Sequence, residues 1–297
     1  MKWEDQRQSD NVEDRRGASS GSGGGGGGRG LRIGGGRGLS LGGIVIALLA
    51  SWALGINPMT VLGLLGGGEV SAPVQQSQPG AKPQDAAARF VSVVLADTED
   101  VWGSYFAASQ QKYAAPALVL FRGRSPTACG MGESAMGPFY CPADRKVYID
   151  LGFYDTLRTQ LGAPGDFAQA YVIAHEVGHH LQNLQGTTAK MDAARQRVSE
   201  REYNALSVRL ELQADCYAGV WANRSQQSKG WLEKGDIEEG LNAAAQIGDD
   251  TLQRKSHGTV VPESFTHGSS EQRMTWFKRG LEAGDLKACD TFRAGAV

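Results

Sequence analysis

Three residues whose side chains can bind a metal or transfer a proton lie close together in the stretch YVIAHEVGHHLQNL: His175, Glu176 and His179. On a helix, residues four positions apart sit roughly 40° apart and one turn along, so both imidazoles project from one face. Two nitrogens need this placement to bind one Zn²⁺ at about 2.0–2.1 Å. Glu176 is rotated about 100° from His175, so it flanks the metal and can address a water there. The motif predicts a zinc helix with Glu176 as general base, and His180, about 140° away, as a neighbour outside the ligand set.

A catalytic zinc needs a third protein ligand and an open position. Downstream, the segment LELQADCYAG places Glu211 and Asp215 four residues apart on one face of a predicted helix. We assign Glu211 as the third ligand. Asp215 would accept a hydrogen bond from a ligand imidazole and fix its tautomer. The alternative for Glu211 is a solvated charge, but the neighbouring leucines indicate a packed helix in which an idle carboxylate would be costly.

Two neutral imidazoles and one carboxylate leave a positive centre, which lowers the pKa of a water to about 7 and polarises a carbonyl group. Glu176 would take the proton from that water and pass it to the leaving amine. Peptide hydrolysis is therefore the leading hypothesis. An oxyanion donor is also expected, and the segment SFTHGSSEQR offers His267 and Arg273. Each has a structural alternative, as a turn histidine or as an ion-pair partner.

Composition divides the chain into four parts. The 30 basic and 32 acidic residues of its 297 nearly cancel, so no global field indicates a nucleic-acid partner. Residues 1–38 are charged and then rich in glycine, which predicts a flexible tail. The other parts are a transmembrane helix over 39–66, a linker over 67–84 and a metallopeptidase domain over 85–297.

The transmembrane prediction depends on length and charge. No charged residue occurs from Gly38 to Gly68, and Leu41–Leu65 would span roughly 37 Å as a helix against a hydrocarbon core of about 30 Å. A buried helix is the alternative, and a cleaved leader is disfavoured by the polar residues that precede the run. Three arginines precede it, whereas the first basic residue after it is Lys82. We therefore expect a single-pass protein of the cell (inner) membrane, with a cytoplasmic N-terminus and an extracytoplasmic catalytic domain.

The four cysteines agree with an exported domain. We favour the pairing of Cys129 with Cys141 and of Cys216 with Cys289, and buried free thiols are the alternative.

The apolar patterns predict an α+β fold, with strands before the central helices and further helices after them. Gly137–Tyr140 is a candidate sheet edge along which an extended peptide adds as a strand, or else an ordinary hairpin closed by a disulfide. Gly178 would let a neighbouring element pack closely. The predicted strands are Pro116–Phe121 and two extended stretches within Gly137–Leu151; the predicted helices lie within Asp85–Gln111, Asp166–Leu184, Ser199–Asn223, Asp236–Asp249 and Ser270–Glu282.

With these motifs in hand, the chain resembles the bacterial putative neutral zinc metallopeptidase family along nearly its whole length. The likeness is carried by KWEDQRQSDNVEDRRG at the start, GPFYCPADRKVYID, the zinc helix, RLELQADCYAGVWA and SFTHGSSEQR. It implies a zincin-like fold and a peptidase using one zinc ion, with His175, His179 and Glu211 as ligands and Glu176 as catalytic acid and base. The metal motif is also similar to that of the Ste24-type and HtpX-type membrane proteases. Those carry several membrane spans, so their substrates are not carried over.

Two other functions are weighed against an endopeptidase that cuts envelope proteins or peptides. A catalytically inactive binding or scaffolding protein would keep zinc for stability, and a fourth protein ligand such as His267 or His257 would favour it. An intramembrane protease is excluded, because the apolar run contains no His, Asp or Glu.

Overall fold

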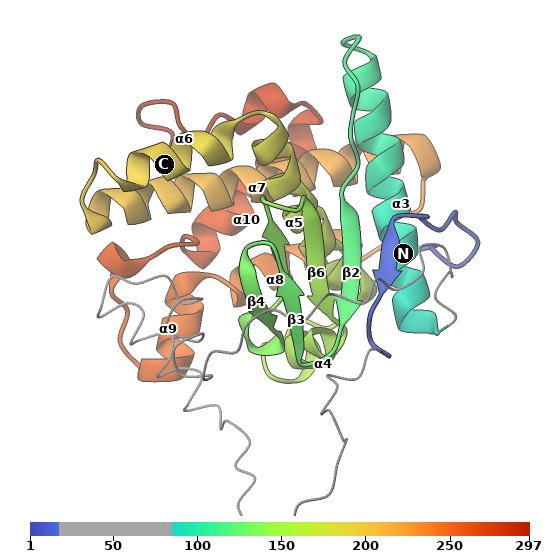
Figure 1. Ribbon diagram of the computed structural model, residues 1–297, viewed down its shortest axis with the longest axis horizontal. Helices are drawn as coiled ribbons and strands as arrows, with labels where there is room; N and C mark the ends of the chain where they lie inside the picture. The colour runs from blue at the N-terminus through green and yellow to red at the C-terminus, as the bar shows by residue number, and fades with distance from the viewer. Residues whose placement is uncertain (18–84) are drawn as a thin grey trace, which may run out of the picture.

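The computed structural model describes residues 1–17 and 85–297 (Figure 1). The predicted transmembrane helix over 39–66, the linker over 67–84 and residues 18–38 of the predicted tail lie outside the described residues. Among the described helices, none combines the length and the apolar character needed to cross a bilayer. The described part is a mixed α+β structure with small sheets, which agrees with the predicted fold class.

A four-stranded sheet forms one layer, in the order β1-β2-β6-β5. β1, β2 and β6 run parallel, and β5 pairs with β6 in the antiparallel sense. The run ALVLF of β2 is apolar throughout because this strand is buried, as is typical of a parallel strand covered on both faces. The predicted strands are confirmed. The bounds are β1 Val12–Asp14, β2 Ala117–Phe121, β5 Phe139–Cys141 and β6 Lys146–Asp150.

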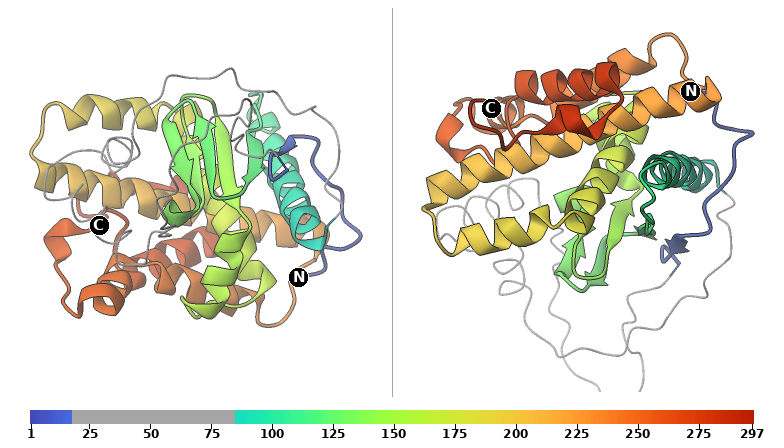
Figure 2. Two further views of the ribbon diagram at one scale, coloured as in Figure 1. Left: turned by 60° about the horizontal axis from the view of Figure 1, so that its bottom comes forward. Right: turned by 90° about the horizontal axis from the view of Figure 1, so that it is seen from above.

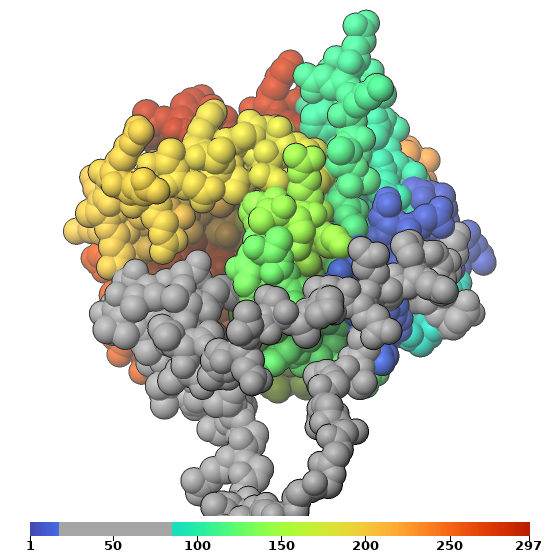
Figure 3. Space-filling view, viewed as in Figure 1, coloured from blue at the N-terminus to red at the C-terminus, as the bar shows by residue number. Residues whose placement is uncertain are grey.

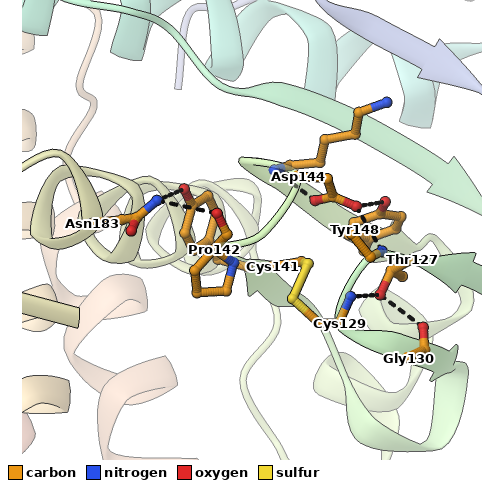
Figure 4. Close-up of a disulfide and its surroundings, with 11 residues drawn as sticks. Thr127, Cys129, Gly130, Cys141, Pro142, Asp144, Tyr148 and Asn183 are labelled. Atoms are coloured by element: carbon orange, nitrogen blue, oxygen red, sulfur yellow. Dashed lines mark hydrogen bonds between the residues drawn. A yellow bond between two sulfur atoms is a disulfide. The ribbon is translucent and has the colours of Figure 1, made fainter. Parts of the chain in front are cut away.

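A two-stranded hairpin of β3 (Arg124–Thr127) and β4 (Gly130–Glu133) leads into β5. The disulfide between Cys129 and Cys141 ties the tip of this hairpin to β5 (Figure 4). A second disulfide, between Cys216 and Cys289, joins helix α7 to the last 3₁₀ turn of the chain. Both bonds form the pairing that we favoured from the sequence, and no described cysteine is free.

Long helices cover the sheet and form the other layer (Figure 2). α3 and α5 pack against each other, and α5, α7 and α10 form a packed core that holds the motif residues in place. The predicted helices are confirmed as α3, α5, α7, α8 and α10, whereas α4, α6 and α9 were not predicted. The helix bounds are α3 Ala86–Ala107, α4 Gly152–Thr159, α5 Asp166–Leu184, α6 Thr187–Arg195, α7 Glu200–Lys229, α8 Asp236–Gln246, α9 Asp249–His257 and α10 Ser270–Ala283.

Two glycines explain how closely these helices approach. A Cβ atom at Gly178 of α5 would lie 3.1 Å from the Cα and carbonyl oxygen of Ala214 on α7, which is tighter than ordinary packing. A Cβ atom at Gly280 of α10 would overlap the carbonyl oxygen of Cys216 on α7. Gly178 therefore does what we expected of it, since it lets α5 and α7 cross close to the two motif histidines.

The start of the chain differs from our prediction. We expected residues 1–38 to be flexible, but Met1–Gly17 pack on the domain, with β1 paired to β2 and the side chains of Met1 and Val12 buried in the main core. The charged composition misled the prediction because only a few apolar residues, spaced along an extended segment, are needed to anchor it on an existing sheet and helix. Residues 18–38 lie outside the described residues.

Candidate metal centre

The motif histidines point the same ring atom toward one carboxylate. His175 and His179 lie on consecutive turns of α5, and Glu211 comes from the facing turn of α7. The Nε2 atom of His175 lies 3.1 Å from Oε2 of Glu211, and the Nε2 atom of His179 lies 3.5 Å from the same oxygen. One ligand atom from each residue falls within 4.8 Å of the others. The structure thus brings the three predicted ligands together.

These separations fit a tetrahedral zinc ion. Ligand atoms about 2.0–2.1 Å from a common tetrahedral centre lie about 3.3 Å apart. The two measured separations to Glu211 lie on either side of that value. Two imidazole nitrogens and one carboxylate oxygen also form the donor set that catalytic zinc sites use. The residues therefore fit the metal in both type and spacing.

A second set of contacts fixes the orientation of each imidazole. The Nδ1 atom of His175 lies 2.8 Å from Oδ1 of Asp215, and the Nδ1 atom of His179 lies 2.8 Å from Oε1 of Gln182. Since both partners accept hydrogen bonds, each Nδ1 donates its proton to its partner, and Nε2 is the nitrogen that each ring has left for a metal. Asp215 takes the place that we predicted for it. Gln182 has the same task for the other histidine.

Arg273 lies beneath this arrangement and is almost fully buried. Its Nε donates to Oδ2 of Asp215 at 2.8 Å and its Nη2 donates to Oδ1 at 2.9 Å, while Tyr171 donates its hydroxyl proton to the same carboxylate. A bidentate guanidinium holds a carboxylate in one plane. Although burial opposes ionisation of Asp215, the charges of Arg273 and His175 outweigh it and lower its pKa. We had considered Arg273 as an oxyanion donor, but its contacts make it the support for Asp215.

The pKa values of Glu211 and His179 are strongly shifted in the metal-free cluster. Burial favours the neutral form of every member, yet the pKa of Glu211 is well below its usual range because His179 and His175 face it. For His179, burial is likewise outweighed by the Glu211 carboxylate, which raises the pKa to about 9. The cluster therefore retains positive charge beside Glu211. A bound cation would replace those protons.

Glu176 lies next to these groups on α5 and is buried. Burial raises the pKa of its carboxyl group, while the nearby charges of His179 and His175 act in the opposite direction. A carboxylate with a raised pKa is a better proton acceptor at neutral pH. His180, by contrast, has both ring nitrogens engaged, one with the carbonyl of Ala114 at 2.6 Å and one with the hydroxyl of Tyr140 at 3.0 Å. It is outside the ligand set, as the spacing predicted.

His267 reaches the same region from the loop before α10. Its Nδ1 lies 3.2 Å from Oδ1 of Asp249, and its backbone N–H donates to Oδ2 of that residue at 2.6 Å. Desolvation lowers the pKa of His267, but the hydrogen bond with Asp249 and the charge of Glu211 outweigh this effect and raise it. His257 is exposed at the end of α9 and does not join the cluster.

Three residues of the site escaped sequence reasoning: Asp249, Gln182 and Tyr171, which donates to Asp215. Asp249, at the start of α9, also accepts the backbone N–H groups of Thr266 and Gly268, so it holds the whole loop that carries His267. Gln182 supports His179 from one turn along α5. Gln182 was in reach of prediction, because residues three apart on a helix are neighbours. Asp249 had no such signal, since it is 18 residues from His267 and belongs to another element.

Comparison with known proteins gives the family of the chain. A family model described as putative neutral zinc metallopeptidase matches residues 1–292. The chain is 54% identical over 293 residues to the uncharacterized protein YpfJ of Escherichia coli strain K12, covering 98% of this chain and 99% of that protein. It is 45% identical over 192 residues to the uncharacterized protein Rv2575 of Mycobacterium tuberculosis strain H37Rv, covering 61% of this chain and 64% of that protein. No solved structure matches.

The family match extends over nearly the whole chain and includes the zinc helix, the Glu211 segment and the loop with His267. The family name implies zinc, which is the metal that the donor set fits. The chain belongs to the putative neutral zinc metallopeptidase family.

Proposed function

We propose that this member of the putative neutral zinc metallopeptidase family is a zinc-dependent endopeptidase that holds one zinc ion at His175, His179 and Glu211. One observation carries the proposal. Three ligand atoms converge beside a buried Glu176, and no fourth His, Cys, Asp or Glu joins them among the described residues. Structural zinc sites are closed by four protein ligands, whereas catalytic ones leave a position open. The mixed α+β arrangement also fits a zincin-like domain.

When bound, zinc would supply Lewis acidity, which makes a water more acidic and a peptide carbonyl more electrophilic. Glu176 accepts a proton from the attacking water and then donates it to the amine that leaves. Asp215, held by Arg273, keeps His175 in the tautomer that offers Nε2. Buried and hydrogen-bonded, these groups need little reorganisation during the reaction.

His267 is proposed as the donor to the developing oxyanion. Its ring is oriented through Nδ1 by Asp249, which leaves Nε2 as the second ring nitrogen available for a substrate. Because its pKa is raised, the ring carries a proton on Nε2 over more of the neutral pH range than a free histidine does. Removing a donor of this kind typically lowers kcat by about 10²–10³.

An extended substrate peptide is proposed to add along β5. This strand pairs with β6 on one side, and its other side carries no strand within the described residues. The hydroxyl of Tyr140 on β5 accepts a hydrogen bond from Asn183 and contacts His180, so β5 is tied directly to the zinc helix. Figure 4 shows Asn183 of α5 also reaching the carbonyl of Pro142, just after this strand. Edge pairing requires an exposed, extended backbone, so unfolded proteins and peptides are the proposed substrates.

The catalytic domain is proposed to lie outside the cytoplasm, attached to the cell membrane through the apolar run. Two disulfides support this location, since such bonds are rare where thiols are kept reduced.

The test is cleavage of an unfolded protein substrate by the purified full-length chain. We expect activity that a chelator abolishes and zinc restores. We expect the Glu176→Gln variant to keep one zinc per chain and to lose about 10²–10⁴ in kcat. Retained activity in that variant would remove the mechanism, and a zinc-loaded wild-type chain that cleaves nothing would indicate a zinc-binding scaffold.

A further inference from the structure

We propose that Met1–Gly17 and the domain over 85–297 fold together in one compartment. The apolar run between them therefore does not separate them by a single passage across the membrane. This revises the single-pass topology with a cytoplasmic N-terminus that the arginine distribution favours. It concerns the placement of the chain and is independent of the proposed peptidase activity.

Backbone pairing makes the N-terminal segment part of the sheet. β1 lies parallel to β2, with Val12 opposite Leu118. Leu118 donates its N–H to the carbonyl of Asn11 at 2.8 Å, and Arg15 donates its N–H to the carbonyl of Leu120 at 2.8 Å. These bonds satisfy the edge of β2, which would otherwise present unpaired backbone groups. The pairing thus provides backbone hydrogen bonds to β2 as well as to the N-terminal segment.

The segment also packs on helix α3. Ser9 and Ser92 exchange hydrogen bonds, from Ser9 N–H to the Ser92 carbonyl at 3.0 Å and from the Ser92 hydroxyl to the Ser9 carbonyl at 3.2 Å. Both serines are buried. Trp3 contacts Phe90 edge to face, with 5.3 Å between ring centroids. In Figure 3 the blue atoms of this segment lie directly against the turquoise atoms of α3. Contacts of this kind belong to a folded core.

Charged contacts bring the two flanks of residues 18–84 together. Glu13 lies 2.6 Å from the ammonium of Lys146 on β6. Arg16, at the end of the segment, lies 2.6 Å from the carboxylate of Asp85, at the start of α3. The two described ends that flank residues 18–84 therefore lie within the reach of two side chains of each other.

The thickness of a bilayer excludes a single crossing between two segments that are in contact. One passage would place Arg16 and Asp85 on opposite sides of about 30 Å of hydrocarbon, which their ion pair forbids. Both flanks consequently lie on the same face of the membrane, and the disulfides of the domain indicate the oxidising one.

The experiment uses a zero-length carbodiimide on isolated membranes that contain the full-length chain. This reagent joins a carboxylate to an amine only when the two are in contact. We expect a covalent bond between Glu13 and Lys146, found by mass spectrometry of the digest. The internal control is the pair Lys229 and Asp100, 2.9 Å apart within the domain. The matched control is Lys146→Arg, which keeps the charge but offers no reactive amine, so its cross-link should vanish.

A cross-link at the control pair without one between Glu13 and Lys146 overturns the proposal. A second measurement does not depend on that pair. Asp5→Cys and Lys190→Cys each place one thiol at an exposed position, the first in the segment and the second in the domain. A membrane-impermeant maleimide applied to spheroplasts should label both variants to the same extent. Labelling of one variant alone contradicts a shared compartment.

Discussion

Two clusters in this molecule satisfy the same geometric condition, and comparing them shows what makes a metal centre. In the metal centre, ligand atoms of His175, His179 and Glu211 lie within 4.8 Å of one another. In the acidic cluster, carboxylate oxygens of Asp166, Asp236 and Glu239 meet the same limit. The first cluster mixes two imidazoles with one acid. The second contains acids only.

The surroundings of the clusters differ as much as their members. In the metal centre, each imidazole is oriented by its own acceptor, and the pKa of Glu211 is lowered by the charges that face it. In the acidic cluster, burial raises the pKa of Asp166 and of Glu239, so these carboxyls are less readily ionised. The amino group of Met1 lies 3.0 Å from Asp166 and 3.4 Å from Asp236. Possible ligand atoms lie close together in both clusters, but only the metal centre orients nitrogen ligands toward a shared point.

The largest effect is expected from a substitution that removes a ligand of the metal centre and leaves the acidic cluster unchanged. Glu211→Gln replaces a charged ligand by a weak neutral one, so we expect the purified chain to lose most of its zinc and its proteolytic activity. Glu239→Gln makes the same chemical change in the acidic cluster and should leave one zinc per chain. Atomic absorption on both variants provides the measurement. Loss of zinc from Glu239→Gln would show that the metal binds in the acidic cluster.

A smaller effect is expected from the support beneath the ligands. Arg273→Gln leaves Asp215 buried beside His175 without its bidentate partner. We expect a zinc affinity about 10–100-fold weaker, as for other groups that orient metal ligands. Unfolding of the metal-free variant by urea should show a loss of about 3–5 kcal/mol, because an uncompensated charge remains in the core. Competition with a chromogenic chelator measures the affinity, and an unchanged value would make Arg273 purely structural.

The pH dependence of zinc binding sharpens the comparison further. The pKa of His179 in the metal-free fold is about 9, above its ordinary value, so this proton stabilises the metal-free chain below about pH 6.5 and ceases to do so as the pH rises through 9. Zinc must displace that proton. We expect the affinity to rise by at least about tenfold per pH unit between pH 6.5 and 8.5, because the pKa of His175 is raised as well.

The same change should appear in thermal unfolding, where the gain in Tm on adding zinc grows across this range. A gain that stays constant with pH would show that His179 is already neutral and would contradict its pairing with Glu211.

The smallest effect is expected in the acidic cluster. Asp166→Asn removes one carboxylate from the surroundings of the Met1 amino group, in a pair of which the acid is partly exposed. Such pairs contribute about 0–1 kcal/mol. Urea unfolding should therefore shift by less than about 1 kcal/mol, with the zinc content unchanged. A loss as large as that of Arg273→Gln would mean that the two clusters are energetically alike.

The zinc helix and the strands around it were predictable because their signals are local. The four-residue spacing of His175 and His179 fixes a common face on any helix, and the alternation around Ile149 indicates a strand before any tertiary contact is known. Glu211 was reached by the same reasoning on the next helix. The cysteine pairing was one of three possibilities, and its outcome agrees with the choice.

The remaining features depend on contacts between distant parts of the chain. Arg273 meets Asp215 across 58 positions, and Asp249 meets His267 from a different helix. Neither pairing has a periodic signature. The N-terminal segment is the clearest case, since its charged composition is typical of a free tail, yet β2 supplies the edge on which it folds. In each case the function of a residue depends on a contact with a residue far away in the sequence, which the local pattern does not show.

The central claim is that two imidazoles and one carboxylate hold a single zinc ion with a coordination position left open. Crystals of the zinc-loaded chain, measured above and below the zinc absorption edge, test it most directly. We predict one anomalous peak, about 2.0–2.1 Å from the Nε2 atoms of His175 and His179 and about 2.0–2.2 Å from an oxygen of Glu211, with no fourth protein ligand. A peak at Asp166 and Asp236, or one closed by a fourth protein side chain, would contradict it.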